Sequence, residues 1–123
     1  MSEPAVVVQR FIDSFIEAWP RADVAQVAAF FTEDAIYHNM PMEPAVGREA
    51  IEATFAQFMA MGGQVDVELL NILSSDTLVM TERVDHFVSD ERTITLPMMG
   101  ICEIHGGLIT AWRDYFDLTQ LAG

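Results

Sequence analysis

The second half of this chain is a succession of long β-type runs, and this succession constrains the fold more than any other feature. The runs cover residues 64–74, 78–89, 92–104 and 108–118. Short segments of Ser, Asp, Glu, His and Gly separate them, and such turn signals between strands favour antiparallel hairpins. We therefore expect a mostly antiparallel sheet built from consecutive strands.

The first half has the pattern of helices. Apolar residues recur at helical spacing between residues 7 and 19, with Ser2 as the expected N-cap and Pro20 as the end. A second helix is expected after Asp23 and a third over residues 48–61, with a short strand over residues 35–40 between them. This order predicts an α+β fold, in which N-terminal helices pack on the concave side of a strongly curved sheet and enclose a conical pocket.

Length and composition narrow the possible ligands. The 123 residues suit a single domain spanning residues 1–123, and the net charge of −13 disfavours nucleic acid, anionic membrane surfaces and anionic substrates. No apolar run is long enough to span a bilayer, and the N-terminus lacks the basic start of a signal peptide. The single cysteine, Cys102, fits a reducing cytoplasm. We expect a neutral, mostly apolar small molecule as the ligand.

Charged residues interrupt two of the predicted strands. Arg83 and Asp85 point to the same face because side chains alternate along a strand, and Asp114 shares its face with Leu108 and Trp112. A carboxylate among large apolar groups is unfavourable unless it is paired or protonated. Two acids and an arginine that converge inside a small core therefore indicate acid/base chemistry.

The periodicity leaves other interpretations open. Arg83 and Asp85 also fit an exposed ion pair on a surface strand, because the opposite face of that run is no more apolar. Asp114 also fits an internal tether for a backbone amide or an arginine. Tyr37 and Asn39 share a face and can together orient one water or one carbonyl oxygen.

No motif in the chain predicts a metal or a cofactor. His38, His86 and His105 lack the spacing of metal ligands. There is no glycine-rich phosphate loop, no dinucleotide fingerprint and no nucleophile elbow. We therefore expect neither a metal ion nor a cofactor.

Three motifs follow one another along the chain, and Gly47-Arg48 opens the third predicted helix. The motifs are Tyr37-x-Asn39-Met40-Pro41, Thr81-Glu82-Arg83-Val84-Asp85 and Gly107-x-Ile109-Thr110-x-Trp112-Arg113-Asp114-Tyr115-Phe116-Asp117. Over most of its length the chain thereby resembles the limonene-1,2-epoxide hydrolase family. The resemblance implies the cone-shaped α+β fold shared with nuclear transport factor 2 and ketosteroid isomerase, a homodimer formed through the outer face of the sheet, and hydrolysis of an epoxide to a vicinal diol.

The family's catalytic roles fall on five residues of this chain. The resemblance implies that Asp114 is the general base, Asp85 the acid, Arg83 the bridge between them, and that Tyr37 and Asn39 hold the water. Apolar residues of the strands are expected to form the pocket wall, namely Met40, Leu69, Met80, Leu96, Met98, Trp112 and Phe116. Two other functions stay open: an isomerase or cyclase on the same fold, with Asp114 or Asp85 as a base beside a carbonyl, and a non-catalytic small-molecule-binding module.

Overall fold

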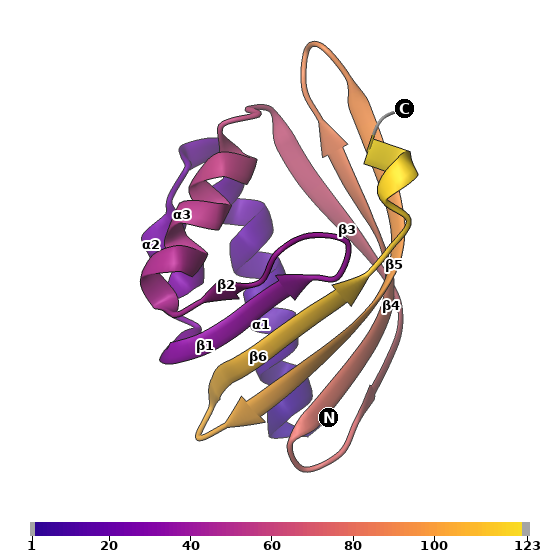
Figure 1. Ribbon diagram of the computed structural model, residues 1–123. Helices are drawn as coiled ribbons and strands as arrows, with labels where there is room; N and C mark the ends of the chain where they lie inside the picture. The colour runs from indigo at the N-terminus through magenta and orange to yellow at the C-terminus, as the bar shows by residue number, and fades with distance from the viewer. Residues whose placement is uncertain (1, 122–123) are drawn as a thin grey trace.

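Helices come first in the chain and the long strands last, as Figure 1 shows for the computed structural model, which describes residues 2–121. The helices are α1 (Glu3–Ala18), α2 (Val24–Ala28) and α3 (Arg48–Met59), with the 3-10 turns η1 (Trp19–Arg21) and η2 (Leu118–Leu121). The strands are β1 (Phe31–Asn39), β2 (Ala45–Val46), β3 (Gln64–Ser74), β4 (Leu78–Val88), β5 (Thr93–His105) and β6 (Leu108–Tyr115). The predicted α+β class is confirmed.

Local signals begin all three helices where the sequence predicts them, whereas α3 ends at Met59, two residues before the expected end. Ser2 caps α1, with its Oγ accepting from the backbone N of Ala5 at 3.4 Å, and Asp23 caps α2 in the same way. The helix α1 ends at Ala18, and the 3-10 turn η1 begins at the next residue, Trp19, followed by Pro20. The Trp19 indole then donates to the Gly62 carbonyl at 2.9 Å, which ties the end of α1 to the turn after α3.

The sheet is mixed rather than purely antiparallel. Its strand order is β2-β1-β6-β5-β4-β3, and the four long strands form consecutive antiparallel hairpins as predicted. The two-residue strand β2 and the parallel pairing of β1 with β6 were not predicted. This parallel pairing brings the Tyr37–Asn39 segment beside the C-terminal half of β6.

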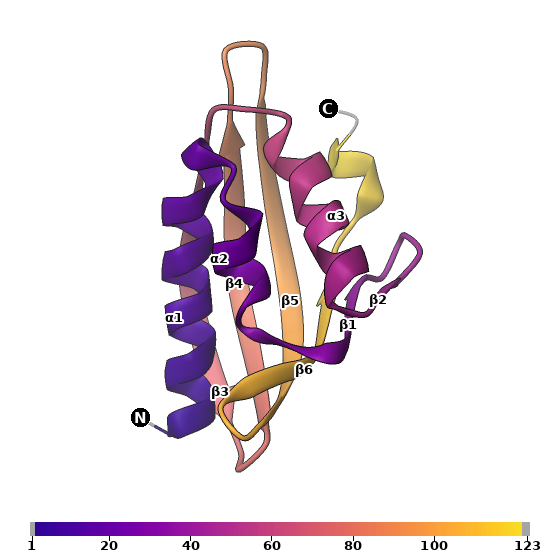
Figure 2. The ribbon, with the colours of Figure 1, turned by 90° about the vertical axis from the view of Figure 1, so that its left-hand side faces the viewer.

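All three helices cover one side of the curved sheet, and Figures 1 and 2 show that side from two directions. Aromatic rings from helices and strands fill the space between the layers. The Phe11 ring lies 4.7 Å from that of Trp112 and 5.5 Å from that of Phe31, measured between centroids. Among residues 2–121, no helix combines the length and the apolar character that a bilayer span needs.

A β-bulge changes the alternation in β6. Glu103 pairs with Ala111 but Ile104 pairs with Ile109, so Thr110 is an extra residue on β6. Ile109 and Trp112 both point into the core, whereas Leu108 is 37% exposed. The predicted shared face of Leu108 with Trp112 and Asp114 is therefore wrong at Leu108, because the bulge shifts the phase before Trp112.

We predict that Arg48 stabilises the joint between α3 and β1. Its Nε and Nη2 both donate to the Phe31 carbonyl, at 3.1 and 2.6 Å. Arg48→Met should lower the free energy of unfolding by about 2 kcal/mol, because a charged donor pair is lost. Urea unfolding measures this, with Arg10→Met on the exposed side of α1 as the control. Equal losses for the two variants would contradict the assigned role.

Candidate active site

Strand register gathers the candidate residues on the concave face. Asp85 lies opposite Leu96, and Arg83 opposite Met98, on the neighbouring strand β5. Asp114 on β6 lies beside Asn39 on β1. Arg83, Asp85 and Asp114 are 4%, 5% and 3% exposed, so the alternative of a surface ion pair is wrong.

Arg83 bridges the two acids. Its Nη2 donates to Asp114 Oδ2 at 2.7 Å, and its Nε donates to Asp85 Oδ1 at 3.0 Å. A longer contact of 3.4 Å joins Nη2 to Asp85 Oδ2. The arginine thus holds both carboxyl groups in fixed positions through charge-assisted hydrogen bonds.

Besides Met98, whose Sδ accepts from Arg83 Nη2 at 2.9 Å, two further side chains complete this network, and sequence reasoning did not assign them these roles. Thr81, which is 1% exposed, accepts from Arg83 Nη1 at 3.0 Å. Trp112, expected only as a pocket wall, also donates its indole N–H to Asp114 Oδ2 at 2.8 Å. Strand alternation already places Thr81 on the face of Arg83 and Trp112 on that of Asp114, which is the signal that could have found both.

The two oxygens of Asp114 differ. Oδ2 accepts from Arg83 and from Trp112, whereas no group among residues 2–121 donates to the buried Oδ1. A buried acceptor of this kind in a folded protein calls for an explanation, because leaving it unpaired is unfavourable. In a site with room for a small molecule, such an oxygen can accept a proton or a hydrogen bond from it.

Burial and neighbouring charges shift the pKa values of three side chains in the site. Loss of water raises the pKa of Asp85; the positive charge of Arg83 opposes this, and the charge of Asp114 adds to it. Burial lowers the pKa of Arg83, but the two acids outweigh this and raise it above its ordinary value. Burial and the charge of Asp114 raise the pKa of Tyr37, so its phenol stays a hydrogen-bond donor. The site therefore combines a carboxyl that keeps its proton to a higher pH than an exposed aspartate does with a permanent cation.

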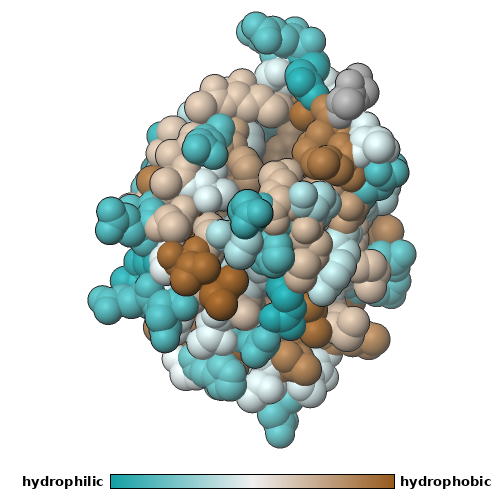
Figure 3. Space-filling model, in the orientation of Figure 1, coloured by the Kyte–Doolittle hydropathy of each residue, from teal (hydrophilic) through white to brown (hydrophobic). Residues whose placement is uncertain are grey.

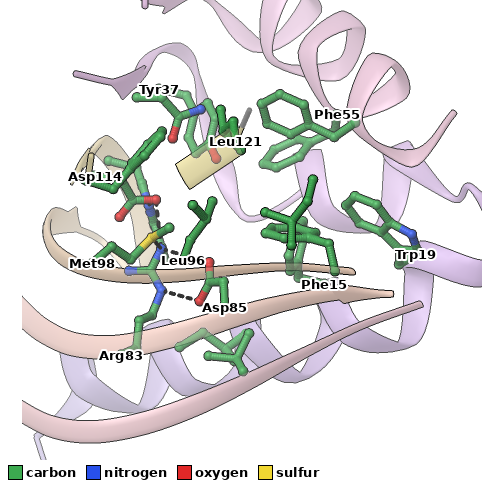
Figure 4. Close-up of a pocket in the computed structure, with 18 of the residues that line it drawn as sticks. Phe15, Trp19, Tyr37, Phe55, Arg83, Asp85, Leu96, Met98, Asp114 and Leu121 are labelled. Carbon is green, nitrogen blue, oxygen red and sulfur yellow. Dashed lines mark hydrogen bonds and ion pairs between the residues drawn. The ribbon is translucent and has the colours of Figure 1, made fainter. Parts of the chain in front are cut away.

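A cavity of about 140 Å³ opens beside this network. Figure 4 shows Asp114, Arg83 and Asp85 toward one end of the cavity, with Phe15 and Trp19 toward the other. The polar end also includes Tyr37 and Asn39. The remaining wall is apolar and comes mainly from aromatic and aliphatic side chains: Phe11, Ile12, Phe15, Trp19, Met42, Phe55, Phe58, Met61, Val67, Phe87, Ile94, Leu96, Met98, Trp112, Phe116 and Leu121.

The predicted wall residues divide into two groups. Leu96, Met98, Trp112 and Phe116 line the cavity. The other three do not line it.

Met40, Leu69 and Met80 lie outside the cavity wall. Met80 precedes Thr81 on β4, so alternation turns it to the convex face, where it is 45% exposed. Met40 follows Asn39 at the end of β1, and Leu69 lies opposite Arg83, two pairs beyond Val67, which does line the cavity. Two methionines that were not predicted, Met42 and Met61, line it instead.

The histidines are separate from this site. His38 hydrogen-bonds to the Met42 carbonyl, and His86 to Glu68 on the neighbouring strand. Within residues 2–121, no cluster of three His, Cys, Asp or Glu side chains is arranged to hold a metal ion.

Comparison with known proteins identifies the family. A model of the SnoaL-like domain matches residues 12–112. The chain belongs to the SnoaL-like family. It is 29% identical over 112 residues to a Mycobacterium tuberculosis protein named epoxide hydrolase EphG, a match that covers 89% of this chain and 73% of that protein. The expected similarity to epoxide hydrolases of the limonene-1,2-epoxide type is therefore confirmed.

Solved structures agree with this assignment. One, described as a limonene-epoxide-hydrolase-like enzyme from M. tuberculosis, is 27% identical, with a TM-score of 0.72, and the match covers 92% of this chain and 84% of that one. A nuclear-transport-factor-2-like protein from Anabaena variabilis is 18% identical, with a TM-score of 0.81, over 94% and 90% of the two chains. A protein with a ketosteroid-isomerase-like fold from Catenulispora acidiphila, in complex with trimethylamine, is 22% identical, with a TM-score of 0.75, over 89% and 87%. The latter two show the fold alone.

We predict a pH-dependent loss of stability that depends on Asp85. Its pKa is raised in the folded state, so above an ordinary value of about 4 the folded protein keeps a proton that the unfolded chain has released. The free energy of unfolding of the wild type should therefore fall, relative to Asp85→Asn, as the pH rises from about 4 through the raised pKa. Urea unfolding at a series of pH values measures this, with the exposed Asp76→Asn as the control. Parallel curves for the wild type and Asp85→Asn would contradict it.

Proposed function

We propose that this protein hydrolyses a neutral epoxide to a vicinal diol by direct attack of water. The observation that carries the proposal is the buried, unpartnered Oδ1 of Asp114, held beside an arginine-bridged second acid in an apolar cavity. The similarity to proteins named as epoxide hydrolases supports the same reaction.

In this mechanism Asp114 is the general base. Its Oδ2 is already occupied by Arg83 and Trp112, so a water molecule hydrogen-bonds to Oδ1 and gives up a proton there as it attacks. Tyr37 and Asn39 border the same end of the cavity and orient the water toward the epoxide carbon.

Asp85 is the general acid. Its raised pKa keeps it protonated when an exposed aspartate is ionised, and its proton passes to the ring oxygen as the carbon–oxygen bond breaks. The water oxygen forms the new bond to carbon, and the two hydroxyls of the diol result. One proton leaves Asp85 and one arrives on Asp114, so a proton exchange with solvent resets the pair for the next turnover.

The cavity suits an apolar, cyclic or terpenoid substrate. Its volume of about 140 Å³ is close to that of an engineered cavity, roughly 150 Å³, that holds benzene, and its wall is mostly aromatic and aliphatic. With the polar groups at one end, the epoxide lies against the two acids and the hydrocarbon part packs toward Phe15 and Trp19.

Asp114→Asn should abolish this reaction. The variant keeps the size of the side chain but cannot take a proton, so diol formation should fall by about 100- to 10,000-fold. Mass spectrometry of the products from limonene oxide and cyclohexene oxide in ¹⁸O-labelled water measures this, with Asp76→Asn as the matched control. In a single turnover of the wild type, the label should enter the diol.

Other outcomes distinguish the alternatives. Label confined to an enzyme carboxylate after one turnover would replace direct attack by a covalent route. A carbonyl product without incorporated label would favour an isomerase on this fold. An Asp114→Asn variant as active as Asp76→Asn would remove Asp114 from the mechanism.

We also propose that the protein works as a homodimer formed through the convex face of the sheet. Large apolar side chains are exposed there on adjacent strands: Leu70 at 51%, Leu73 at 73%, Met80 at 45%, Met99 at 45% and Tyr115 at 49%. Figure 3 shows apolar groups along the margin of the molecule on the side of the sheet away from the helices. Such a patch suits the apolar centre of an interface between two copies.

Leu73→Glu should weaken this dimer, because a charge would be buried at the interface. Sedimentation equilibrium of the wild type should give twice the monomer mass of 13.7 kDa, and the variant should approach that monomer mass. Val46→Glu, at an exposed apolar position on β2, is the control. A monomeric wild type would overturn the proposal.

A further inference from the structure

Gly100 lies in the middle of β5, between the two strands that carry the charged network. It pairs with Thr81 on β4 and with Asp114 on β6. Met98 and Cys102, two positions away on either side, are 8% and 0% exposed on the concave face. A side chain at position 100 would therefore be buried beneath the network.

No room exists there for a side chain. A Cβ atom built on Gly100 would lie 2.6 Å from Arg83 Nη1, 2.6 Å from Asp114 Oδ1 and 3.0 Å from Thr81 Oγ1. Contacts that short essentially never occur in proteins. Arg83 Nη1 and Thr81 Oγ1 are bonded to each other, and Asp114 Oδ1 belongs to the carboxylate whose Oδ2 accepts from Arg83, so moving these groups away disturbs the network.

The backbone gives no other reason for a glycine at this position. Five other glycines of the described chain adopt a positive φ, which other residues avoid: Gly47, Gly62, Gly63, Gly106 and Gly107. Gly100 does not, and it lies in a regular, paired stretch of strand, where glycine ordinarily weakens the sheet. The close approach of the Arg83 and Asp114 side chains is what requires it.

We propose that Gly100 is a positioning residue, whose missing side chain provides the space in which Arg83 and Asp114 meet and Asp114 Oδ1 keeps its place. The contact geometry stands on its own, and the expected effect on turnover rests on the proposed function. A methyl group at this position displaces either the guanidinium or the carboxylate. Asp114 Oδ1 then no longer lies where it can accept the proton.

Gly100→Ala tests this, with Val79→Ile as the matched control. Both substitutions add one carbon to the concave side of the sheet, and Val79 is fully buried but makes no hydrogen bond of the network through its side chain. Gly100→Ala should lower kcat by at least about tenfold, with KM within about twofold of the wild type, because positioning rather than apolar binding is lost. Val79→Ile should change neither by more than about twofold.

A second readout does not depend on activity. The chain has six arginines, and the Nε–H of Arg83 is buried and bonded to Asp85, so its NMR signal can be assigned by its loss in Arg83→Lys. This signal should shift in Gly100→Ala and stay in place in Val79→Ile. An unchanged Arg83 signal together with unchanged kcat in Gly100→Ala would overturn the proposal.

A third comparison covers the case in which Gly100→Ala does not fold. In the Asp114→Ala background the carboxylate is gone and the guanidinium has room to move, so the added methyl group is tolerated. Gly100→Ala should lower the melting temperature of the wild type by about 4 °C or more, or prevent folding, and lower that of Asp114→Ala by less than half as much. Equal losses in the two backgrounds, or failure of the Gly100→Ala/Asp114→Ala double variant to fold, would overturn the proposal.

These readouts separate the two proposals. If the wild type hydrolyses no epoxide while the Arg83 signal and the melting temperatures change as expected, the proposed function fails and the positioning role of Gly100 stands. If the wild type is active and Gly100→Ala matches it in every readout, the positioning role fails alone.

Discussion

The ion bridge from Arg83 to Asp85 and Asp114 is the interaction on which the rest of the site depends. Burying an arginine and two carboxyl groups is costly, and removing one partner of a buried ion pair typically costs about 3–5 kcal/mol, because the other is left uncompensated. The neighbouring residues reduce this cost. Thr81 and Trp112 each supply a further hydrogen bond to the bridge, and Gly100 leaves the space for it. A buried network of this kind is tolerated only when nearly every polar group has a partner.

The curved sheet brings the three side chains of the bridge together, and their surroundings there shift the pKa values of Asp85 and Arg83. Alternation along β4 and β6 points all three charged side chains to one face, and the helices on that face exclude water from them. The same exclusion raises the pKa of Asp85 while Arg83 stays charged. Two identical side chains thus have different surroundings, and the proposed division into an acid and a base rests on that difference.

Much of the fold and of the candidate site could be predicted from the sequence, because both depend in large part on local rules of propensity and side-chain alternation. The bounds of β3, β4 and β5 to within one residue, the helix caps at Ser2 and Asp23 and the shared face of Arg83 and Asp85 follow from propensity and alternation. By contrast, β1 begins four residues before the expected start, and β6 ends three residues before the expected end. These local rules do not predict which face of β4 is buried, because that depends on helices from a distant part of the chain. The bulge at Thr110 also depends on pairing between strands, which is why Leu108 was assigned to the wrong side. Met80 was assigned to the pocket wall although alternation alone places it on the face opposite Arg83. The role of Gly100 becomes visible only when both of its neighbouring strands are known.

The free oxygen of Asp114 separates a structural network from a functional one. If the bridge served only to hold β4 and β6 together, a hydrogen-bond donor at Oδ1 would stabilise it further. The position nearest to Oδ1 on the neighbouring strand is instead Gly100, which offers no donor and no bulk. The protein thus keeps an unpartnered acceptor at an energetic cost, beside an apolar cavity and opposite an acid that favours its proton. A buried acceptor left without a partner beside such a cavity is more consistent with a reacting group than with a structural tether.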